Sequence, residues 1–283
     1  MKRKVYTPKD SVVAQRDLIL KDFVNIIKST IPTNGYAFKG GYILKSILSS
    51  CDKTKNIRHT TDIDVDLSCE EYQELLINRV IPYLEELKRK GVIYSYAINK
   101  VEISASGVPI SGRIILYRKP SANVKKRVFC GIDFNVHPLF YGIVKMSDGT
   151  SIYAIERTLG DKFMALYLAS EKKLLHRVKD ILDLYLLNQF LTEKNAKLDF
   201  SITLRTIQEE LVQNYNLSLL PPVSDLEKML ISNPEKLYNE VRYLLKTERV
   251  SADLLEYSTV PDIVKVAVSF INVVRCKYYE FYR

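Results

Sequence analysis

The chain has 283 residues, of which 47% are hydrophobic and 27% are charged, a composition that excludes a wholly disordered or fibrous protein. Its 42 Lys and Arg exceed its 33 Asp and Glu, so the formal net charge is +9, which favours polyanionic partners such as nucleic acid or nucleotide phosphates. The longest late apolar run, residues 266–274, is far below the ~20 residues that cross a membrane, and we expect no membrane partner. The four cysteines form no CxxC pair, which argues against a zinc site and for reduced thiols in a cytoplasmic protein.

The first part of the chain predicts a helix, a short strand and a second helix. Apolar residues at helical spacing indicate an amphipathic helix over residues 8–30, and a strand is expected at 36–39 before a helix at 42–50. Gly40 and Gly41 then lie at a helix N-terminus, where free backbone N–H groups favour an anion such as a triphosphate. An ordinary strand-to-helix turn is the alternative interpretation of these two glycines.

An acidic strand is predicted next, in the segment DIDVDL. Side chains alternate sides along a strand, so Asp62, Asp64 and Asp66 share one face, and Ile63 and Val65 face the other side, where they can pack. Carboxylates this close repel one another unless a cation lies between them. Hard oxygen ligands favour Mg²⁺ or Mn²⁺ as that cation.

A helix and three more strands are expected after the acidic strand. The helix should cover residues 69–90, with Ser68 and Glu71 as a capping box and a bend or interruption near Pro82. Runs rich in β-branched and aromatic residues predict strands of the same sheet at residues 92–103, 113–117 and 128–136.

Asp133 is the only acid in the otherwise apolar run VFCGIDFNV. A carboxylate inside such a strand is costly unless it is paired or binds a cation. Two interpretations follow: Asp133 pairs with a basic residue across the sheet, with Arg113 as the candidate, or it is a third metal ligand beside Asp62 and Asp64.

Long helical patterns replace strand signals from Ala154 onward. We therefore expect two domains, residues 1–150 and residues 151–283. Core helices are predicted at 155–170 and 174–190, and Ser224 with Glu227 forms another capping box. Further helices should start at Asn233-Pro234 and at Ser251, and a last one should cover residues 261–282, with its tyrosines either docked on the core or free to stack on bases.

Arg177, Asp180 and Asp183 recur at three-residue intervals and share one helix face. Taken alone, this spacing is typical of a solvated ion pair.

Several segments together resemble a known family. KGG at residues 39–41 with RHTTDID at residues 58–64 resembles the glycine pair and DxD signature of the polymerase-beta-like nucleotidyltransferase superfamily. ERTLGDKFMALYLAS followed by HRVKDILDLYLL is similar to the later motifs of the AbiEii nucleotidyltransferase toxins of bacterial toxin-antitoxin and phage-defence systems. The resemblance covers about residues 35–190. It implies an α+β fold, with an N-terminal nucleotidyltransferase-type mixed sheet flanked by helices and a C-terminal helical bundle that completes the active-site cleft.

The resemblance also assigns roles by position. The metal ligands would be Asp62, Asp64 and Asp133, and Asp133 could also accept the proton of the acceptor hydroxyl. The catalytic set would add Lys162 and Asp180. The substrate-binding residues would be Lys39, Gly40, Gly41, Arg58, Thr61, Arg177 and Asp183. Asp66 falls outside this pattern and is expected to support the site or to be solvated.

The chain departs from the family pattern at two places. Gly41 stands where the wider superfamily often has Ser, which removes a hydroxyl donor to phosphate. Residues 160–162 read GDK where many relatives have Ala-Glu-Lys. Neither change removes a metal ligand.

The implied function is metal-dependent transfer of a nucleoside monophosphate from an NTP to an acceptor, with Mg²⁺ or Mn²⁺ as cofactor. The tRNA 3′ end is the expected acceptor, because the basic surplus suits RNA phosphates, and a cognate antitoxin is the expected protein partner. The alternatives are transfer to a small hydroxylated molecule or to a protein, and a non-catalytic module that binds RNA or a partner protein.

Overall fold

The computed structural model describes residues 8–48, 60–103, 109–118, 127–139, 141–246 and 258–282. The chain divides into two compact units, and each is described by itself below. The first comprises Met1–Ile43 with Thr60–Tyr153, and the second comprises Leu44–His59 with Ala154–Arg283.

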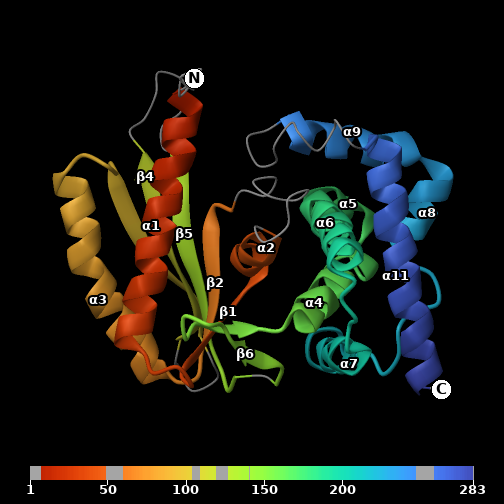
Figure 1. The fold of residues 1–283 in the computed structure, drawn as a ribbon, viewed down its shortest axis with the longest axis horizontal. Helices are drawn as coiled ribbons and strands as arrows, with labels where there is room; N and C mark the ends of the chain where they lie inside the picture. The colour runs from red at the N-terminus through yellow and green to blue at the C-terminus, as the bar shows by residue number, and fades with distance from the viewer. Residues whose placement is uncertain are drawn as a thin grey trace. The chain divides into compact units, whose positions relative to one another are not determined.

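A mixed sheet forms the centre of the first unit (Figure 1). In the described part of the chain it has seven strands in the order β3-β4-β5-β2-β1-β7-β6. The strands are β1 (Tyr36–Lys39), β2 (Asp62–Leu67), β3 (Ser95–Ile103), β4 (Pro109–Arg118), β5 (Arg127–Val136), β6 (Ile143–Lys145) and β7 (Ser151–Tyr153). β2 pairs with β5 and β1 pairs with β7 in parallel, and the other neighbours are antiparallel. Strands β6 and β7 were not predicted from the sequence.

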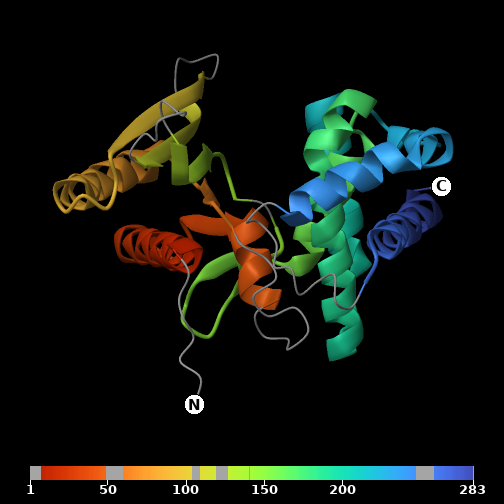
Figure 2. The same cartoon turned by 90° about the horizontal axis from the view of Figure 1, so that it is seen from above.

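Helices α1 (Pro8–Thr30) and α3 (Glu70–Arg89) cover one face of this sheet (Figure 2). α1 contacts β5, and α3 contacts β2 and β5. Apolar side chains of alternate strand positions, such as Ile63, Ile132 and Ile114, lie in register on neighbouring strands and are fully buried. The opposite face of the sheet therefore carries the side chains of the acidic positions.

Two details of α3 differ from the sequence prediction. The predicted capping box of Ser68 and Glu71 does not form, because the helix begins one residue later, after Cys69, whose side chain makes no capping hydrogen bond. Pro82 lies inside a single continuous helix, so the predicted interruption is absent.

The second unit is helical, which confirms the α+β fold class. Its helices are α4 (Ile155–Tyr167), α5 (Glu171–Leu174), α6 (Val178–Lys194), α7 (Phe200–Tyr215), α8 (Asp225–Ser232), α9 (Pro234–Lys246) and α11 (Val260–Tyr282), with a 3-10 turn η1 (Leu175–Arg177) before α6. Helix α2 (Gly40–Leu48) begins in the first unit, and Leu44 and Leu48 belong to the core of the second. The helix predicted from Ser251 lies outside the described residues.

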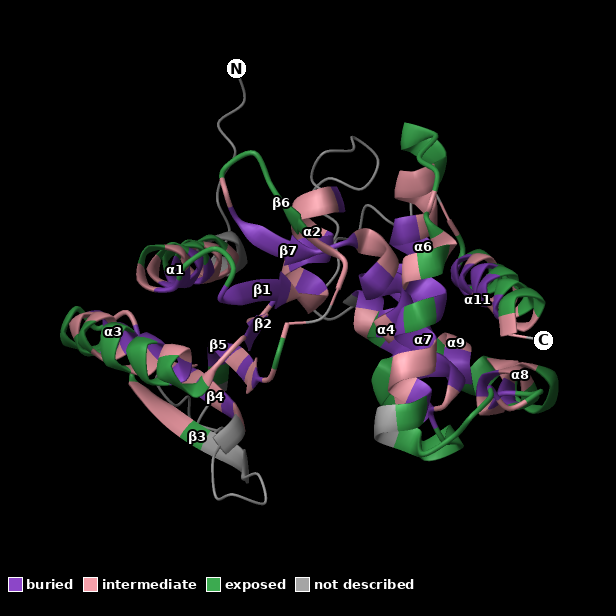
Figure 3. Cartoon of the chain, turned by 90° about the horizontal axis from the view of Figure 1, so that it is seen from below, coloured by how far each residue is buried: buried purple, intermediate pink, exposed green. Residues whose placement is uncertain are grey.

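In the first unit, β7 is buried throughout, and β1 is buried except at its last residue, Lys39 (Figure 3). In the second unit, α4, α6, α7 and α11 supply many of the fully buried side chains of the core, among them Phe163, Ile181, Ile207 and Ile263. No helix in the described ranges is long and apolar enough to cross a membrane.

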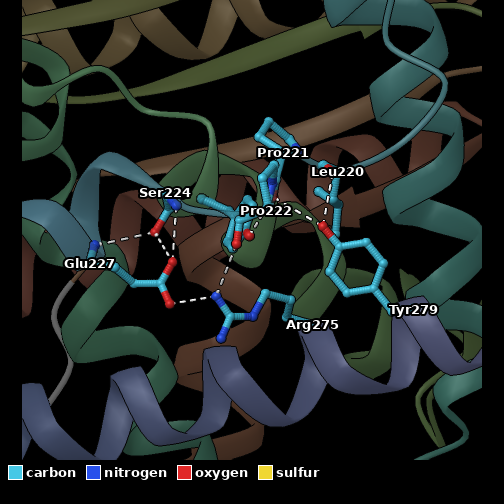
Figure 4. Close-up of polar contacts among 8 residues, drawn as sticks. Leu220, Pro221, Pro222, Ser224, Glu227, Arg275 and Tyr279 are labelled. Carbon is cyan, nitrogen blue, oxygen red and sulfur yellow. Dashed lines mark hydrogen bonds and ion pairs between the residues drawn. The ribbon is translucent and has the colours of Figure 1, made fainter.

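The loop before α8 is fastened to α11 by polar contacts (Figure 4). The Ser224 side chain caps α8 in the capping box predicted with Glu227, and Arg275 on α11 donates to Glu227 Oε1 at 2.5 Å. The Tyr279 hydroxyl donates to the carbonyl of Leu220 at 2.9 Å. The fully buried Tyr278 donates to Gln208 at 2.6 Å, so these tyrosines dock on the core rather than face solvent.

Candidate active site

Three carboxylates project from neighbouring strands on the face that α1 and α3 leave uncovered. β2 runs parallel to β5 with Asp64 directly opposite Asp133, and Asp62 lies opposite Gly131. The side chains of Asp62 and Asp133 are 33% and 35% exposed, so solvent reaches both. The three residues that were predicted as metal ligands therefore lie on two neighbouring strands and face the same side of the sheet.

The glycine turn packs directly against this acidic strand. Lys39 at the end of β1 pairs in register with Asp64, and the next residue, Gly40, has φ of +70° and opens α2. A Cβ placed on Gly40 would lie 2.1 Å from Asp64 Oδ2, a distance that no pair of unbonded heavy atoms tolerates. Gly40 is therefore required both for the backbone turn and for the position of the Asp64 carboxylate. The N-terminal N–H groups of α2 start at this turn, as the anion-cradle interpretation requires.

Arg113 joins two of the three carboxylates. On β4 it lies directly opposite Asp133, and its Nε is 2.7 Å from Asp133 Oδ1. Its Nη2 is 3.6 Å from Asp62 Oδ2. The structure thus contains the cross-strand partner that the ion-pair interpretation of Asp133 named.

The donor set suits a divalent cation by its chemistry, because Mg²⁺ and Mn²⁺ prefer carboxylate oxygens. Within the described ranges, however, no three His, Cys, Asp or Glu side chains are gathered closely enough to hold one ion. The guanidinium of Arg113 bridges Asp62 and Asp133 instead. Metal binding by Asp62, Asp64 and Asp133 is taken up below as a proposal.

Asp66 is the centre of a buried polar cluster, so the expectation that it could be solvated was wrong. It is 1% exposed. Lys39 Nζ lies 2.5 Å from Oδ1, and His137 Nε2 lies 3.2 Å from Oδ2. Asn135 Nδ2 and the Tyr153 hydroxyl donate to it at 3.1 and 3.0 Å. Burial alone would raise the pKa of Asp66, but hydrogen bonds and charge from His137 and Lys39 outweigh burial and hold the pKa below its usual range.

This cluster contains Lys39, which was predicted to bind substrate and whose ammonium is paired with Asp66. It also contains His137 and Tyr153, which the sequence interpretation did not select. The available signal was weak, since neither residue belongs to a motif and β7 is only three residues long.

Two threonines, of which Thr61 was predicted to bind substrate, lie beside Asp62. The Thr61 hydroxyl donates to Asp62 Oδ1 at 3.3 Å, and the buried Thr60 donates to the Asp62 carbonyl at 2.9 Å. Thr61 therefore orients a carboxylate. Arg58 lies outside the described residues.

A second charged cluster belongs to the second unit. Lys162 on α4 contacts Asp180 Oδ1 at 2.5 Å and Asp183 Oδ2 at 2.9 Å, both on α6. Arg177 Nη1 lies 3.8 Å from Asp180 Oδ2. Asp180 and Asp183 are buried, so the solvated ion pair suggested by their spacing is wrong. Burial alone would lower the pKa of Lys162, but the two carboxylates outweigh burial and raise it, which keeps Lys162 protonated.

The structure also gives a reason for the glycine in the GDK segment. A Cβ on Gly160 would lie 2.8 Å from Thr206 Cβ on α7 and 3.2 Å from the Thr203 carbonyl oxygen. Helices α4 and α7 therefore pack too closely at this point for an alanine.

The mixed sheet, the glycine turn and the acidic face agree with the nucleotidyltransferase resemblance of the sequence. The model of the family described as "Nucleotidyl transferase AbiEii toxin, Type IV TA system" matches residues 30–250. The chain belongs to this family of toxins. It is an NTP-dependent nucleotidyltransferase of the kind found in toxin-antitoxin systems.

Solved structures with a similar fold share little sequence with the chain. A candidate nucleotidyltransferase from H. pylori is 15% identical with a TM-score of 0.47, over 93% of this chain and 96% of that one. JHP933 from Helicobacter pylori is 14% identical with a TM-score of 0.44, over 93% of each chain. The Megavirus polyadenylate synthase is 10% identical with a TM-score of 0.40, over 88% of this chain and 51% of that one. No curated protein matches the chain.

Proposed function

We propose that the protein transfers a nucleoside monophosphate from an NTP to the 3′ end of tRNA in a reaction that depends on Mg²⁺ or Mn²⁺. The observation that carries this proposal is the direct register of Asp64 and Asp133 on parallel strands, with Gly40 packed under Asp64. The family membership supports the transfer chemistry, and the net charge of +9 supports an RNA acceptor.

In this proposal Asp62, Asp64 and Asp133 hold the metal ions, which would lower the pKa of the attacking hydroxyl and neutralise the leaving pyrophosphate. The backbone N–H groups at Gly40 and Gly41 bind the triphosphate at the start of α2. The acceptor hydroxyl oxygen forms a bond to the α-phosphorus, the α–β anhydride bond breaks, and Asp133 accepts the hydroxyl proton.

The other assigned residues support this chemistry. Thr61 fixes the Asp62 carboxylate, and Asp66 holds the Lys39 ammonium next to the glycine turn. In the helical unit we assign Lys162 to phosphate, Asp180 to catalysis, and Arg177 and Asp183 to substrate binding. A tRNA acceptor implies action in the cytoplasm, and a cognate antitoxin restrains it.

Incubation of the full chain with labelled NTPs, MnCl₂ and total RNA tests the proposal. Wild-type protein should place label on tRNA-sized RNA, at the 3′ end, and EDTA should abolish the label. Asp64→Asn should lower transfer by at least about 100-fold, because it removes a metal-binding charge. Asp148→Asn is the matched control, since Asp148 pairs with Lys28 at the surface and not with the acidic face.

Label only on protein or on small molecules would favour the alternative acceptors and refute the tRNA proposal. Equal transfer by wild type and Asp64→Asn would refute the assigned site. Transfer that persists in EDTA would refute the metal requirement alone.

A further inference from the structure

Arg113 has a place at the acidic face that neither the family resemblance nor the proposed reaction uses. Its guanidinium contacts Asp133 through Nε and Asp62 through Nη2. Both of these aspartates, together with Asp64, are metal ligands in the proposed function, and this inference rests on that assignment.

The location of Arg113 follows from the sheet. β4, β5 and β2 are consecutive strands, and Arg113, Asp133 and Asp64 form one row across them. Like charges directly opposite each other on neighbouring strands are destabilising, so the Asp64 and Asp133 pair needs a nearby cation. Arg113 supplies one positive charge and a fork of donors suited to carboxylates.

Asp62 and Asp133 would hold the metal ion in the proposed function, and both carboxylates are the present partners of Arg113. Mg²⁺ prefers carboxylate oxygens as close ligands, and a guanidinium and a cation of like charge repel each other at short range. The ion and Arg113 would therefore compete for the two carboxylates.

We propose that Arg113 is an internal counter-ion that occupies the metal position between Asp62 and Asp133 until a metal–nucleotide complex displaces it. In this role Arg113 lowers the affinity of the empty enzyme for free divalent ions. The phosphates of the nucleotide carry negative charge, so they offer the displaced guanidinium new partners and offset the loss of its carboxylates.

Mn²⁺ binding to the full chain, without nucleotide, measures this competition. The free Mn²⁺ concentration is followed by electron paramagnetic resonance as protein is titrated. Arg113→Met keeps the length of the side chain and removes its charge, and we expect a Kd for Mn²⁺ about tenfold lower than in wild type. Tenfold corresponds to about 1.4 kcal/mol, close to the value of one hydrogen bond to a charged group.

Arg118→Met is the matched control. Arg118 lies on the same strand, and the substitution removes the same charge, but its guanidinium contacts Gln15 on α1 and the ring of Phe129. Its Mn²⁺ affinity should equal that of wild type within about twofold. If Arg118→Met raised the Mn²⁺ affinity as much as Arg113→Met does, net charge alone would explain the effect, and the proposal would be overturned.

An unchanged or weaker Mn²⁺ affinity in Arg113→Met would also overturn it, because removing a cation that occupies the metal position must tighten Mn²⁺ binding. Should Arg113→Met fail to fold, Arg113→Lys takes its place. A single ammonium does not span both carboxylates, so Mn²⁺ should bind about threefold more tightly, and wild-type affinity would contradict the proposal.

The outcome is independent of nucleotide transfer. Tighter Mn²⁺ binding by Arg113→Met without any transfer by wild type would leave the counter-ion role standing and refute the proposed function. Nucleotide transfer by wild type, with no gain in Mn²⁺ affinity in Arg113→Met, would leave the proposed function standing and refute the counter-ion role.

Discussion

At Gly40 the backbone turns with φ of +70°, and the Asp64 carboxylate lies against its α-carbon. We expect Gly40→Ala to lower nucleotide transfer at least about tenfold, because the new Cβ displaces Asp64 from its place in the acidic row. The free energy of unfolding should fall by roughly 2–4 kcal/mol, from the left-handed backbone and the clash together. Transfer assays and urea unfolding provide the two measurements.

Gly91 is the control for this substitution. It has nearly the same φ, +71°, but a Cβ there would have no heavy atom within 4 Å. Gly91→Ala should therefore cost only the backbone term, about 1–2 kcal/mol, and leave transfer intact. Equal losses of stability at the two positions would contradict the role given to the Asp64 contact.

His137 makes the stability of the Asp66 cluster depend on pH. Burial alone would lower the pKa of His137, but its hydrogen bond to Asp66 and the charge of Asp66 outweigh burial and raise it. The folded pKa thus exceeds the unfolded value of about 6.5. The stabilisation is complete below that value and is lost as the pH rises through the folded pKa.

We expect His137→Gln to reduce the free energy of unfolding by roughly 1–2 kcal/mol near pH 5.5 and by clearly less near pH 9, since the substitution removes the imidazolium charge. Urea unfolding at both pH values measures the difference. The exposed His176 allows a control, His176→Gln, which should show no such pattern. A loss that is constant with pH would mean that the imidazolium contributes nothing.

At the scale of secondary-structure elements, Lys162 connects α4 to α6 through two buried carboxylates. Lys162→Met leaves Asp180 and Asp183 buried without their cation, and we expect a loss of roughly 3–5 kcal/mol in the free energy of unfolding. The exposed pair of Lys228 and Asp225, at 2.7 Å, provides the comparison, since Lys228→Met should cost less than about 1 kcal/mol. Similar losses in urea unfolding would show that Lys162 is not held as the structure indicates.

The elements with strong local patterns could be predicted from the sequence. Period-two alternation identified β2 and its acidic face, and the lone acid in β5 led to both of its partners, the neighbouring aspartates and Arg113. Helix α7 was missed although a signal existed, because Asp199 accepts a hydrogen bond from the Ser201 backbone as an N-cap.

The Asp66 cluster could not be predicted in the same way. Its members come from β1, β2, β5, β7 and the residue after β5, His137, and the pairing of β1 with β7 joins Phe38 to Ile152. β6 and β7 have three residues each, too few for alternation to be recognised. Long-range pairing is decided by which surfaces pack together in the folded chain, and no local pattern encodes it.

For the whole molecule, the surplus of nine positive charges predicts how acceptor binding responds to salt. Phosphate contacts release counterions, so the affinity for tRNA should fall at least about tenfold between roughly 50 and 200 mM salt. Fluorescence anisotropy with labelled tRNA and Asp64→Asn protein, which we expect to be inactive, measures this without turnover. An affinity independent of salt would contradict an RNA acceptor bound through its backbone.

The strand order also determines when the contacts of Asp64 and Asp66 can form during synthesis on the ribosome. Tyr153 reaches the Asp66 carboxylate across 87 residues of sequence, which a ribosome adds in roughly 4–17 s at about 5–20 residues per second. Asp133 likewise joins Asp64 only after β5 has been synthesised. A nascent chain that already carries the glycine turn and the acidic strand therefore lacks the third carboxylate. The strand order therefore leaves the acidic face incomplete until most of the first unit has been synthesised.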